Sequence, residues 1–464
     1  MTLIKSISGI RGTIGSKAGE GLDPLQAVKF TLAYGTYLRK KKKEGQVTVV
    51  LGRDARISGQ YLEKLVSASL NSIGVNVING GLSTTPTIEL AVLNHKADGG
   101  IILTASHNPK NWNALKFFNE KGEFIDAETG SEVLRMAEKE NFTYVEEDQL
   151  GTEIHDDTFI ARHVQMILDM PLVDRDAIKN AGLVVIVDAI NSTGALAIPS
   201  LLDALGVKKY KVINDDVSGN FSHNPEPLPE NLSELSAMVR ERDAHMGIVV
   251  DPDVDRLAFV DEDGEMFGEE YTLVAVADYV LKHSKGNTVS NLSSTMALRD
   301  ITLKAGAEYH ASAVGEVNVV KKMKEVNAVI GGEGNGGVIY PPLHYGRDAL
   351  AGIALFLSML AKDKKPLSIL KTQYPSYQIS KNKLELPAGT DVDAIIEKIR
   401  VQYDKPENKI DLQDGLKIDF GTEWVHLRKS NTEPIIRIYA ESDSMVKSES
   451  IANKIMGDIK EVLR

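Results

Sequence analysis

The chain has 464 residues, of which 42% are hydrophobic and 25% charged, so it is a globular protein too long for a single hydrophobic core. Its net charge of −12 argues against a nucleic-acid partner, and the absence of cysteine excludes disulfides, thiolate metal sites and cysteine nucleophiles. No apolar run approaches a membrane span or a secretory signal, so we expect a cytoplasmic protein without a membrane partner. The sequence leaves the oligomeric state open.

The first part of the chain alternates short apolar runs with helical patterns. Asp23 and Pro24 predict the start of a helix, as its N-cap and first residue, and the basic run 39–43 suits the end of that helix. Further elements are expected as strands at Val47–Leu51, Val75–Ile78 and Ile101–Leu103 and as a helix from Ser58 to Ile73. This alternation predicts a mainly parallel sheet.

The same pattern recurs later in the chain, where three apolar runs each open onto a polar tip. These are Leu183–Val187 before Asp188, Gly247–Val250 before Asp251 and Ala328–Ile330 before Gly331. After Ser376 short strands and two helical stretches, Val392–Tyr403 and Met445–Leu463, predict an α+β domain. The predicted domains are residues 1–155, 156–255, 256–370 and 371–464, with Tyr144–Asp157 as the first linker.

The strand Ile101–Leu103 ends in the sequence Thr-Ala-Ser-His-Asn-Pro, residues 104–109. Ligands of open α/β sheets bind at this end of the strands, which makes Ser106 a candidate nucleophile. The alternative is a turn whose polar side chains bond only to one another. We do not expect His107 to act as a triad base, because adjacent residues on a turn cannot easily meet, and the G-x-S-x-G pattern is absent here.

Three acids alternate in Asp251-Pro252-Asp253-Val254-Asp255-Arg256. An EF-hand is the alternative, and Glu262 falls at its twelfth position, but Arg256 stands where that loop requires glycine and the flanks are apolar strands. Three neighbouring carboxylates repel one another unless a cation lies between them, and oxygen ligands favour Mg²⁺. We expect Arg256 to pair with a phosphate or with an acid of this loop.

Two further loops are rich in glycine or in cations. Gly331–Gly337 contains the spacing G-x-G-x-x-G after a strand, but a dinucleotide site requires a helix next, and Val338–Pro342 cannot start one. Arg428–Pro434 mixes cations and hydroxyls before an apolar run. Taken alone, it is either a solvated loop or an anion site.

In this order the four stretches resemble the α-D-phosphohexomutase family, from Gly9–Gly12 (G-I-R-G) to Glu441. Thr104–Pro109 matches the family's T-A-S-H-N-P serine loop at every position. The opening and the Arg428–Pro434 loop look most like the phosphoglucosamine mutase branch. The resemblance implies three α/β domains and a C-terminal α+β domain around a central cleft.

The resemblance also implies roles for single residues. Ser106 would carry a phosphate and, with the three aspartates Asp251, Asp253 and Asp255, hold Mg²⁺. Lys116 has the position of the general acid–base, although by itself it suggests a surface lysine, and Arg11 that of an arginine near the transferring phosphate. The implied substrate contacts are Glu333 and Asn335 for sugar hydroxyls, and Arg428, Ser430, Asn431, Thr432 and Arg437 for a phosphate.

Two positions depart from the family pattern. Asn335 replaces the usual serine, but an amide still donates and accepts hydrogen bonds. Gly337 stands where many members have a histidine with an acid–base or substrate-positioning role, so that role is not transferred to this chain. His344 lies nearby in the sequence and is not assigned as a substitute.

The implied reaction interconverts hexose 6-phosphate and hexose 1-phosphate through a phosphoserine and a hexose 1,6-bisphosphate. We rank glucosamine phosphate first as the sugar-phosphate substrate, with phosphomannomutase/phosphoglucomutase activity as the alternative, because no residue can be assigned to C2 of the sugar. A sugar-phosphate phosphatase would use the same loops but release phosphate to water. A non-catalytic binding protein would not need Ser106 together with three acids.

Overall fold

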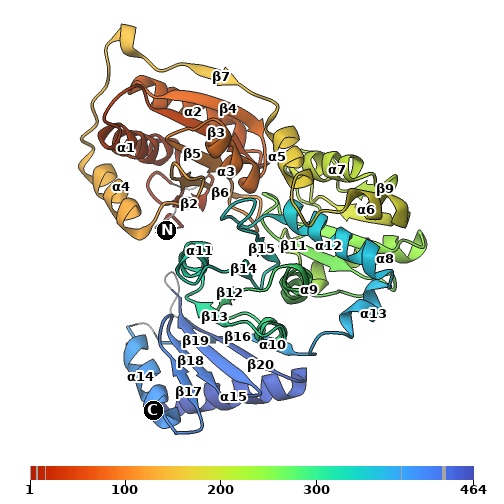
Figure 1. The fold of residues 1–464 in the computed structure, drawn as a ribbon. Coiled ribbons are helices and arrows are strands. Elements are labelled where there is room, and N and C mark those ends of the chain that lie inside the picture. The colour runs from red at the N-terminus through yellow and green to blue at the C-terminus, as the bar shows by residue number, and fades with distance from the viewer. Residues whose placement is uncertain (1, 7–8, 16, 388, 431–434, 464) are drawn as a thin grey trace. The chain divides into compact units, whose positions relative to one another are not determined.

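The structure is a computed structural model that describes residues 2–6, 9–15, 17–387, 389–430 and 435–463 (Figure 1). The chain forms two compact units. The first unit consists of the residues up to Thr272 and of Asn335–Ile369, and the second of Leu273–Gly334 and the residues from Leu370 onward. The boundary falls within helix α9 (Glu269–His283), and the chain returns to the first unit after Gly334.

The N-terminal part of the first unit is a seven-stranded sheet in the order β1-β2-β6-β5-β3-β4-β7. Its strands are β1 (Ile4–Ser6), β2 (Gly9–Thr13), β3 (Thr48–Arg53), β4 (Asn76–Leu82), β5 (Gly99–Leu103), β6 (Trp112–Phe118) and β7 (Glu153–His155). Strands β3, β4 and β5 are parallel, as predicted, and β6 returns antiparallel beside β5. The segment expected to be a linker instead contributes β7, which pairs with β4 at the edge of the sheet.

The helices of this part begin with α1 (Pro24–Lys41), which starts where the sequence predicts. The side chain of Asp23 accepts a hydrogen bond from the amide of Gln26 at 2.9 Å, and basic residues occupy the last turn. The others are α2 (Gly59–Ser72), α3 (Thr85–Asn94) and α4 (Ala127–Lys139).

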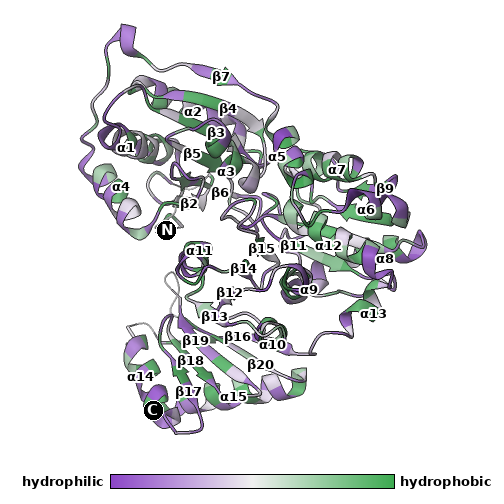
Figure 2. Cartoon of the chain, in the orientation of Figure 1, coloured by the Kyte–Doolittle hydropathy of each residue, from purple (hydrophilic) through white to green (hydrophobic). Residues whose placement is uncertain are grey.

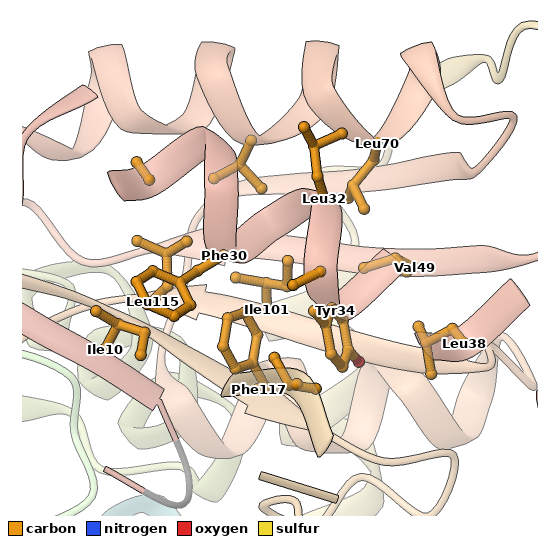
Figure 3. Close-up of a cluster of buried hydrophobic side chains, with 14 of the residues drawn as sticks. Ile10, Phe30, Leu32, Tyr34, Leu38, Val49, Leu70, Ile101, Leu115 and Phe117 are labelled. Atoms are coloured by element: carbon orange, nitrogen blue, oxygen red, sulfur yellow. The ribbon is translucent and has the colours of Figure 1, made fainter. Parts of the chain in front are cut away.

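Helix α1 packs on the sheet through aromatic side chains (Figure 3). The ring of Tyr34 stacks on that of Phe117 with centroids 4.6 Å apart, and its hydroxyl donates to the carbonyl of Phe118 at 2.6 Å. Phe30 is buried in the same cluster. Each buried aromatic side chain contributes roughly 1.5–3 kcal/mol. This packing fixes β6 beside β5, and these are the strands that carry Lys116 and lead into the serine loop.

The second sheet of the first unit has the order β11-β10-β8-β9. Its strands are β8 (Val184–Asp188), β9 (Lys209–Ile213), β10 (Met246–Val250) and β11 (Leu257–Val260), and its helices are α5 (Phe159–Leu168), α6 (Arg175–Ala181), α7 (Gly194–Leu205) and α8 (Ser233–Glu241). Strands β8, β9 and β10 are parallel, whereas β10 and β11 form an antiparallel hairpin. The aspartate loop is the turn of that hairpin.

Helix α12 (Ala349–Asp363) is buried from Ala349 to Ala361, and Figure 2 shows mostly hydrophobic residues along it. The ring of Phe356 stacks on Phe259 of β11 with centroids 3.9 Å apart. The hairpin that carries the aspartate loop is therefore anchored in the interior. The short strand β15 (Gly337–Ile339) precedes this helix in the chain.

The second unit contains three parallel strands, β13 (Tyr309–Ser312), β12 (Thr288–Asn291) and β14 (Ile330–Glu333), with helices α10 (Met296–Lys304) and α11 (Glu316–Glu325). Its C-terminal part is an antiparallel sheet in the order β16-β20-β19-β18-β17. The elements are β16 (Gln378–Glu385), α14 (Val392–Tyr403), β17 (Lys409–Asp411), β18 (Leu416–Asp419), β19 (Trp424–Lys429), β20 (Ile435–Ser442) and α15 (Met445–Val462). Helix α13 (Leu367–Lys371) lies before them in the chain.

The predicted fold class, α/β modules followed by an α+β domain, is confirmed. One local prediction is wrong, because β14 begins at Ile330 and continues to Glu333, so that half of the glycine-dense stretch is a strand. Among the described residues, no helix is both long and apolar enough to cross a membrane.

Candidate active site

Ser106 lies in the turn that follows β5, where the sequence analysis placed it. The residue is 7% exposed and has a φ of 48°, which is uncommon for a residue other than glycine. Its amide donates to the hydroxyl of Thr104 at 2.9 Å. A left-handed backbone conformation at such a residue costs on the order of 1–3 kcal/mol, so it is kept only where surrounding contacts hold it. Such strained residues are common at functional sites.

A buried ion pair, Asp54 with Arg56, holds the serine loop in place and was missed by the sequence analysis. The carboxylate of Asp54 accepts from Nε of Arg56 at 3.0 Å and from the hydroxyl of Thr104 at 2.7 Å. The Arg56 guanidinium donates to the loop carbonyls of Ser106 and of Asn108 and Pro109, the last two at 2.7 Å. It also donates to the carbonyl of Trp112, the first residue of β6, at 3.0 Å. Both residues follow β3, which pairs in parallel with β5, so they lie at the same edge of the sheet as the serine loop. That strand pairing is the signal from which the sequence could have indicated their role.

The three aspartates of the loop between β10 and β11 are completely buried, and one oxygen from each lies within 4.8 Å of the others. Val254, between two of them, is also buried and has a φ of 61°, which is an outlier for a β-branched residue. Its amide donates to the carbonyl of Asp251 at 3.1 Å, and its carbonyl accepts from the amide of Ala349 at 3.2 Å. The protein thus holds a strained turn in order to keep three carboxylates together.

Asp251 connects this loop to the serine. Its Oδ2 accepts a hydrogen bond from the hydroxyl of Ser106 at 2.7 Å. Its Oδ1 accepts from the amides of Asp255 and Arg256, at 3.2 and 3.1 Å. The serine loop and the aspartate loop, 145 positions apart in the sequence, therefore meet at hydrogen-bond distance.

The other two aspartates are each satisfied on one oxygen only. Oδ2 of Asp253 accepts from Nζ of Lys116 at 2.8 Å and from the hydroxyl of Thr85 at 2.6 Å. Oδ2 of Asp255 accepts from Nη2 of Arg347 at 2.6 Å. Oδ1 of each is buried and has no hydrogen-bond partner among the described residues. Such oxygens are costly to bury alone, so this donor set fits a hard cation such as Mg²⁺.

The charges of the site shift one another's protonation. Burial, with Asp255 and Asp253 as further causes, raises the pKa of Asp251 well above its usual range. Burial also opposes the charged forms of Asp253 and Lys116, but their mutual ion pair outweighs it, lowering the pKa of Asp253 and raising that of Lys116. Lys116 is therefore an ammonium group paired within the site and not the surface lysine that the bare sequence suggests.

Arg11 lies on β2, which pairs antiparallel with β6. The register places Arg11 opposite Ala114 and Gly9 opposite Lys116. Arg11 and Lys116 therefore lie on the same face of the sheet as diagonal neighbours. The structure thus brings together Ser106, Lys116 and the three aspartates, with Arg11 on the adjoining strand.

Two expectations about neighbouring residues need correction. His107 does reach Ser106, since its Nδ1 lies 3.4 Å from the hydroxyl oxygen, although Asp251 is closer. Burial and the charges of Arg256 and Arg347 hold the pKa of His107 well below its usual range. The ion pair of Arg256 is with Glu226, 3.1 Å from its guanidinium, and not with an acid of its own loop.

The two residues expected to contact the sugar are held by local hydrogen bonds. Glu333 ends β14 and is buried, and its Oε1 accepts from Nδ2 of Asn291 at 2.9 Å and from the amide of Gly315 at 3.0 Å. The side chain of Asn335 accepts from the amide of Gly337 at 3.2 Å. A strand, β15, follows this stretch, so the helix that a dinucleotide site requires is absent there.

In the second unit, Arg428 near the end of β19 lies directly opposite Arg437 of β20. Two like charges at opposite positions destabilise a sheet unless an anion compensates them. Nε of Arg428 lies 2.7 Å from Asp414, which supplies part of that compensation. The amide of Ser430 donates to the carbonyl of Ile435 at 3.1 Å. The predicted contacts Asn431 and Thr432 lie outside the described residues.

Comparison with known proteins identifies the family. Models of the phosphoglucomutase/phosphomannomutase domains match the chain in order, with α/β/α domain I at residues 3–144, domain II at 161–264, domain III at 268–377 and the C-terminal domain at 382–457. A curated phosphoglucomutase/phosphomannomutase from Thermococcus kodakarensis is 36% identical over 442 residues, which are 95% of this chain and 94% of that protein. The chain belongs to the α-D-phosphohexomutase family.

Other phosphohexomutases agree with this assignment. The phosphoglucosamine/phosphogalactosamine mutase of Sulfurisphaera tokodaii is 34% identical, over 98% of each chain. The X-ray structure of a phosphoglucomutase/phosphomannomutase family protein from Burkholderia thailandensis has a TM-score of 0.84 and 26% identity, covering 99% of this chain and 98% of that one. The resemblance drawn from the motifs is thus confirmed, and the chain is a phosphohexomutase, an enzyme of the isomerase class.

Proposed function

We propose that this phosphohexomutase interconverts hexose 6-phosphate and hexose 1-phosphate through a phosphorylated Ser106 and a hexose 1,6-bisphosphate. The observation that supports this most directly is the hydroxyl of Ser106 at 2.7 Å from Asp251. Asp253 and Asp255, in the same loop, each keep one buried oxygen without a hydrogen-bond partner among the described residues. A hydroxyl beside an acidic cage suits phosphoryl transfer better than the binding of a neutral sugar.

The cage would hold Mg²⁺ through Asp251, Asp253, Asp255 and the phosphate on Ser106. When bound, Mg²⁺ supplies positive charge to the oxygens of the transferring phosphoryl group. The chain itself supplies the cations of Lys116 and, from the adjoining strand, Arg11. Electrostatic stabilisation and positioning are the main contributions to catalysis of this reaction type.

Two half-reactions complete the cycle. In the first, the bond between phosphorus and Oγ of Ser106 breaks, and a bond from phosphorus to the free hydroxyl of the sugar phosphate forms. In the second, the bisphosphate has turned around and its other phosphoryl group returns to Oγ. In each half-reaction one oxygen loses a proton and another gains one. We assign that exchange to Lys116, which Asp253 holds at 2.8 Å.

The phosphate that is not transferred would be bound by Arg428 and Arg437. Their two positive charges lie directly opposite each other in the sheet and would attract an anion. Ser430, Asn431 and Thr432 would complete its shell. Glu333 and Asn335 would bind the sugar hydroxyls; the carboxylate of Glu333 is already oriented by Asn291 and Gly315. Binding energy from these remote contacts can be used to position the reacting group.

Glucosamine phosphate is the substrate that we rank first. The phosphoglucosamine-like opening and phosphate loop support this ranking, as does the similarity to the mutase from Sulfurisphaera tokodaii. The phosphoglucomutase/phosphomannomutase name of the Thermococcus kodakarensis relative makes that activity the alternative. A coupled assay should compare kcat/KM for glucosamine 6-phosphate, mannose 1-phosphate and glucose 1-phosphate on one preparation, while free phosphate is measured in parallel.

A tenfold preference for either of the other two sugars, about 1.4 kcal/mol in transition-state stabilisation, would reverse the ranking. Release of phosphate without an isomeric product would instead indicate a phosphatase and refute the mutase reaction. A bisphosphate that restores activity to dephosphorylated enzyme would support the proposed cycle.

A further inference from the structure

Arg347 was not singled out by the sequence, yet its side chain enters the proposed cation site. It lies immediately before Asp348, the N-cap of α12, and its side chain is only 10% exposed. Its Nη2 donates to Oδ2 of Asp255 at 2.6 Å. Burial and then the charge of Arg256 lower the pKa of His107, and the charge of Arg347 adds to that shift. At Lys116, whose pKa is raised, the charge of Arg347 opposes the rise. A permanently charged guanidinium thus lies beside the serine loop, the lysine and the aspartates.

The path of this side chain depends on a glycine. A Cβ atom placed on Gly337 would lie 2.3 Å from Cδ and 3.0 Å from Cγ of Arg347. The backbone of Gly337 is not left-handed, so space and not conformation excludes a side chain there. Because the guanidinium is held by Asp255, the middle of the arginine side chain cannot swing aside without breaking that contact. Arg347 therefore fills the volume that a side chain at position 337 would occupy.

The contact with Arg347 also settles which oxygen of Asp255 remains available. Oδ2 is occupied by the guanidinium, and Oδ1 stays buried without a hydrogen-bond partner among the described residues. Side chains that hydrogen-bond a metal ligand orient it, and their loss typically weakens metal binding about 10–100-fold. The geometry of this pair is that of a ligand and its orienting partner.

We propose that Arg347 is the positioning residue of Asp255: by holding Oδ2, it orients the carboxylate so that Oδ1 faces the bound cation. We also propose that Gly337, which has no side chain, leaves the space that the side chain of Arg347 needs. The inference rests on the proposed function only in taking the acidic loop to bind Mg²⁺. A purely structural ion pair would affect stability alone. A positioning role for Arg347 predicts in addition that variants which keep every charge bind Mg²⁺ more weakly.

The test therefore uses variants that keep every charge. In Gly337→Ala the new methyl group displaces the arginine side chain, and in Arg347→Lys the planar fork is lost while the charge remains. We expect each to weaken Mg²⁺ binding about tenfold or more, measured by isothermal titration calorimetry on the full chain. Gly457→Ala is the matched control, because a Cβ there would meet nothing within 4 Å. It should bind Mg²⁺ as the wild type does.

A double-mutant cycle tests the steric part. Gly337→Ala should lower Tm and Mg²⁺ affinity in the wild-type background but have little further effect once Arg347→Ala has removed the clashing atoms. Equal effects in both backgrounds would overturn the dependence on Gly337. If Gly337→Ala does not fold, Arg347→Lys decides the cation effect alone.

The outcomes separate the two proposals. Unchanged Mg²⁺ affinity in the charge-conserving variants, with only Tm lowered, would show a structural ion pair and overturn the positioning role alone. A wild-type chain that does not bind Mg²⁺, or binds it equally after Asp253→Asn, would overturn the cation site and the role of Arg347 with it.

Discussion

Nε2 of His163 lies 2.8 Å from Oδ2 of Asp348, and both side chains are buried. The same carboxylate oxygen lies 3.1 Å from Nε2 of His344, whose Nδ1 is 3.2 Å from Oε2 of Glu89. These residues come from α5, the start of α12, the segment before it and α3. The network thus joins two helices of the first unit to the segment that carries Arg347.

This network should make stability depend on pH. Burial disfavours the charged imidazole of His344, but Asp348 and Glu89 outweigh burial and raise its pKa to about 10. A raised pKa stabilises the folded chain fully below the ordinary value of about 6.5 and loses that effect as the pH rises toward 10. The pKa of Asp348 is lowered, again against burial and by the two histidines, so its contribution is lost as the pH falls below about 4.

His344→Gln should therefore lower stability by about 3–5 kcal/mol at pH 7, because it removes a positive charge that faces two buried carboxylates, Glu89 and Asp348. The difference from wild type should shrink at pH 10, where His344 loses its proton. Thermal unfolding of both proteins at the two pH values measures this. His155→Gln, at a side chain that is 76% exposed, is the control. An equal difference at both pH values would show that the charge of His344 does not matter.

A second prediction concerns the nucleophile. Ser106→Ala should lose the covalent phosphate and nearly all mutase activity, because no other hydroxyl in the described structure donates to Asp251. Intact mass before and after incubation with hexose bisphosphate detects the phosphate directly. Ser131→Ala, on the exposed side of α4, should keep both phosphate and activity. Full turnover by Ser106→Ala would refute the phosphoserine cycle.

The sequence was sufficient to predict a site residue where a single short stretch contains both the strand and the polar residues directly after it. Ser106 and Asp251 each follow an apolar run closely, and the runs proved to be β5 and β10. The fold class was predictable for the same reason, and α14 matches its predicted range, Val392–Tyr403. Local patterning of this kind is sufficient to place strands, helices and the tips at which ligands bind.

What the sequence missed depends on partners far away in the chain. Arg56 bonds to carbonyls some 50 residues later, and Arg347 reaches Asp255 across 92 residues. Neither lies in a motif that we recognised. Gly331–Glu333 was expected to belong to a glycine-rich loop, yet the segment continues β14 and Gly331 pairs with Val289 of β12. Tertiary pairing decided all three cases.

The cation site gives a third prediction. Chelation should stop turnover, and Mg²⁺ should restore it. Asp253→Asn should weaken Mg²⁺ binding and turnover together, because the amide supplies a neutral oxygen in place of a carboxylate and loses the ion pair with Lys116. Titration calorimetry and steady-state kinetics on one preparation measure both. Asp263→Asn, at an exposed position on the next turn, is the control. Unchanged affinity and rate in Asp253→Asn would remove the assignment.

A fourth prediction concerns the support of the serine loop. Arg56→Lys keeps a charge beside Asp54, so the chain should fold, but an ammonium group cannot bond to four carbonyls at once. A small misplacement of the nucleophile can cost about 100-fold in rate. We expect kcat to fall about 10–100-fold with Mg²⁺ affinity retained. Arg53→Lys, which pairs with Glu63 on the same segment, is the control. A normal kcat would show that the loop holds its shape without the guanidinium fork.

The last prediction separates remote binding from chemistry, and it uses the second unit. Arg428 lies opposite Arg437 and is proposed to hold the phosphate that does not react. A hydrogen bond to a charged group is worth roughly 1.5–3 kcal/mol, so Arg428→Ala should lower kcat/KM about 10–150-fold. Because remote binding energy also positions the reacting phosphate, part of the loss should appear in kcat.

The control for this experiment is Arg400→Ala, which removes an arginine paired with Glu397 and Asp404 on the surface of α14 in the same unit. It should leave both kinetic constants unchanged. Inorganic phosphate should inhibit the wild type competitively. It should inhibit Arg428→Ala less strongly, because only one of the two facing guanidinium groups, that of Arg437, remains to bind the anion. A loss of kcat/KM below twofold, with inhibition by phosphate unchanged, would mean that Arg428 does not bind the substrate. Asp414, at 2.7 Å from its Nε, would then be its sufficient partner, and the opposed arginines would be a structural feature of the sheet.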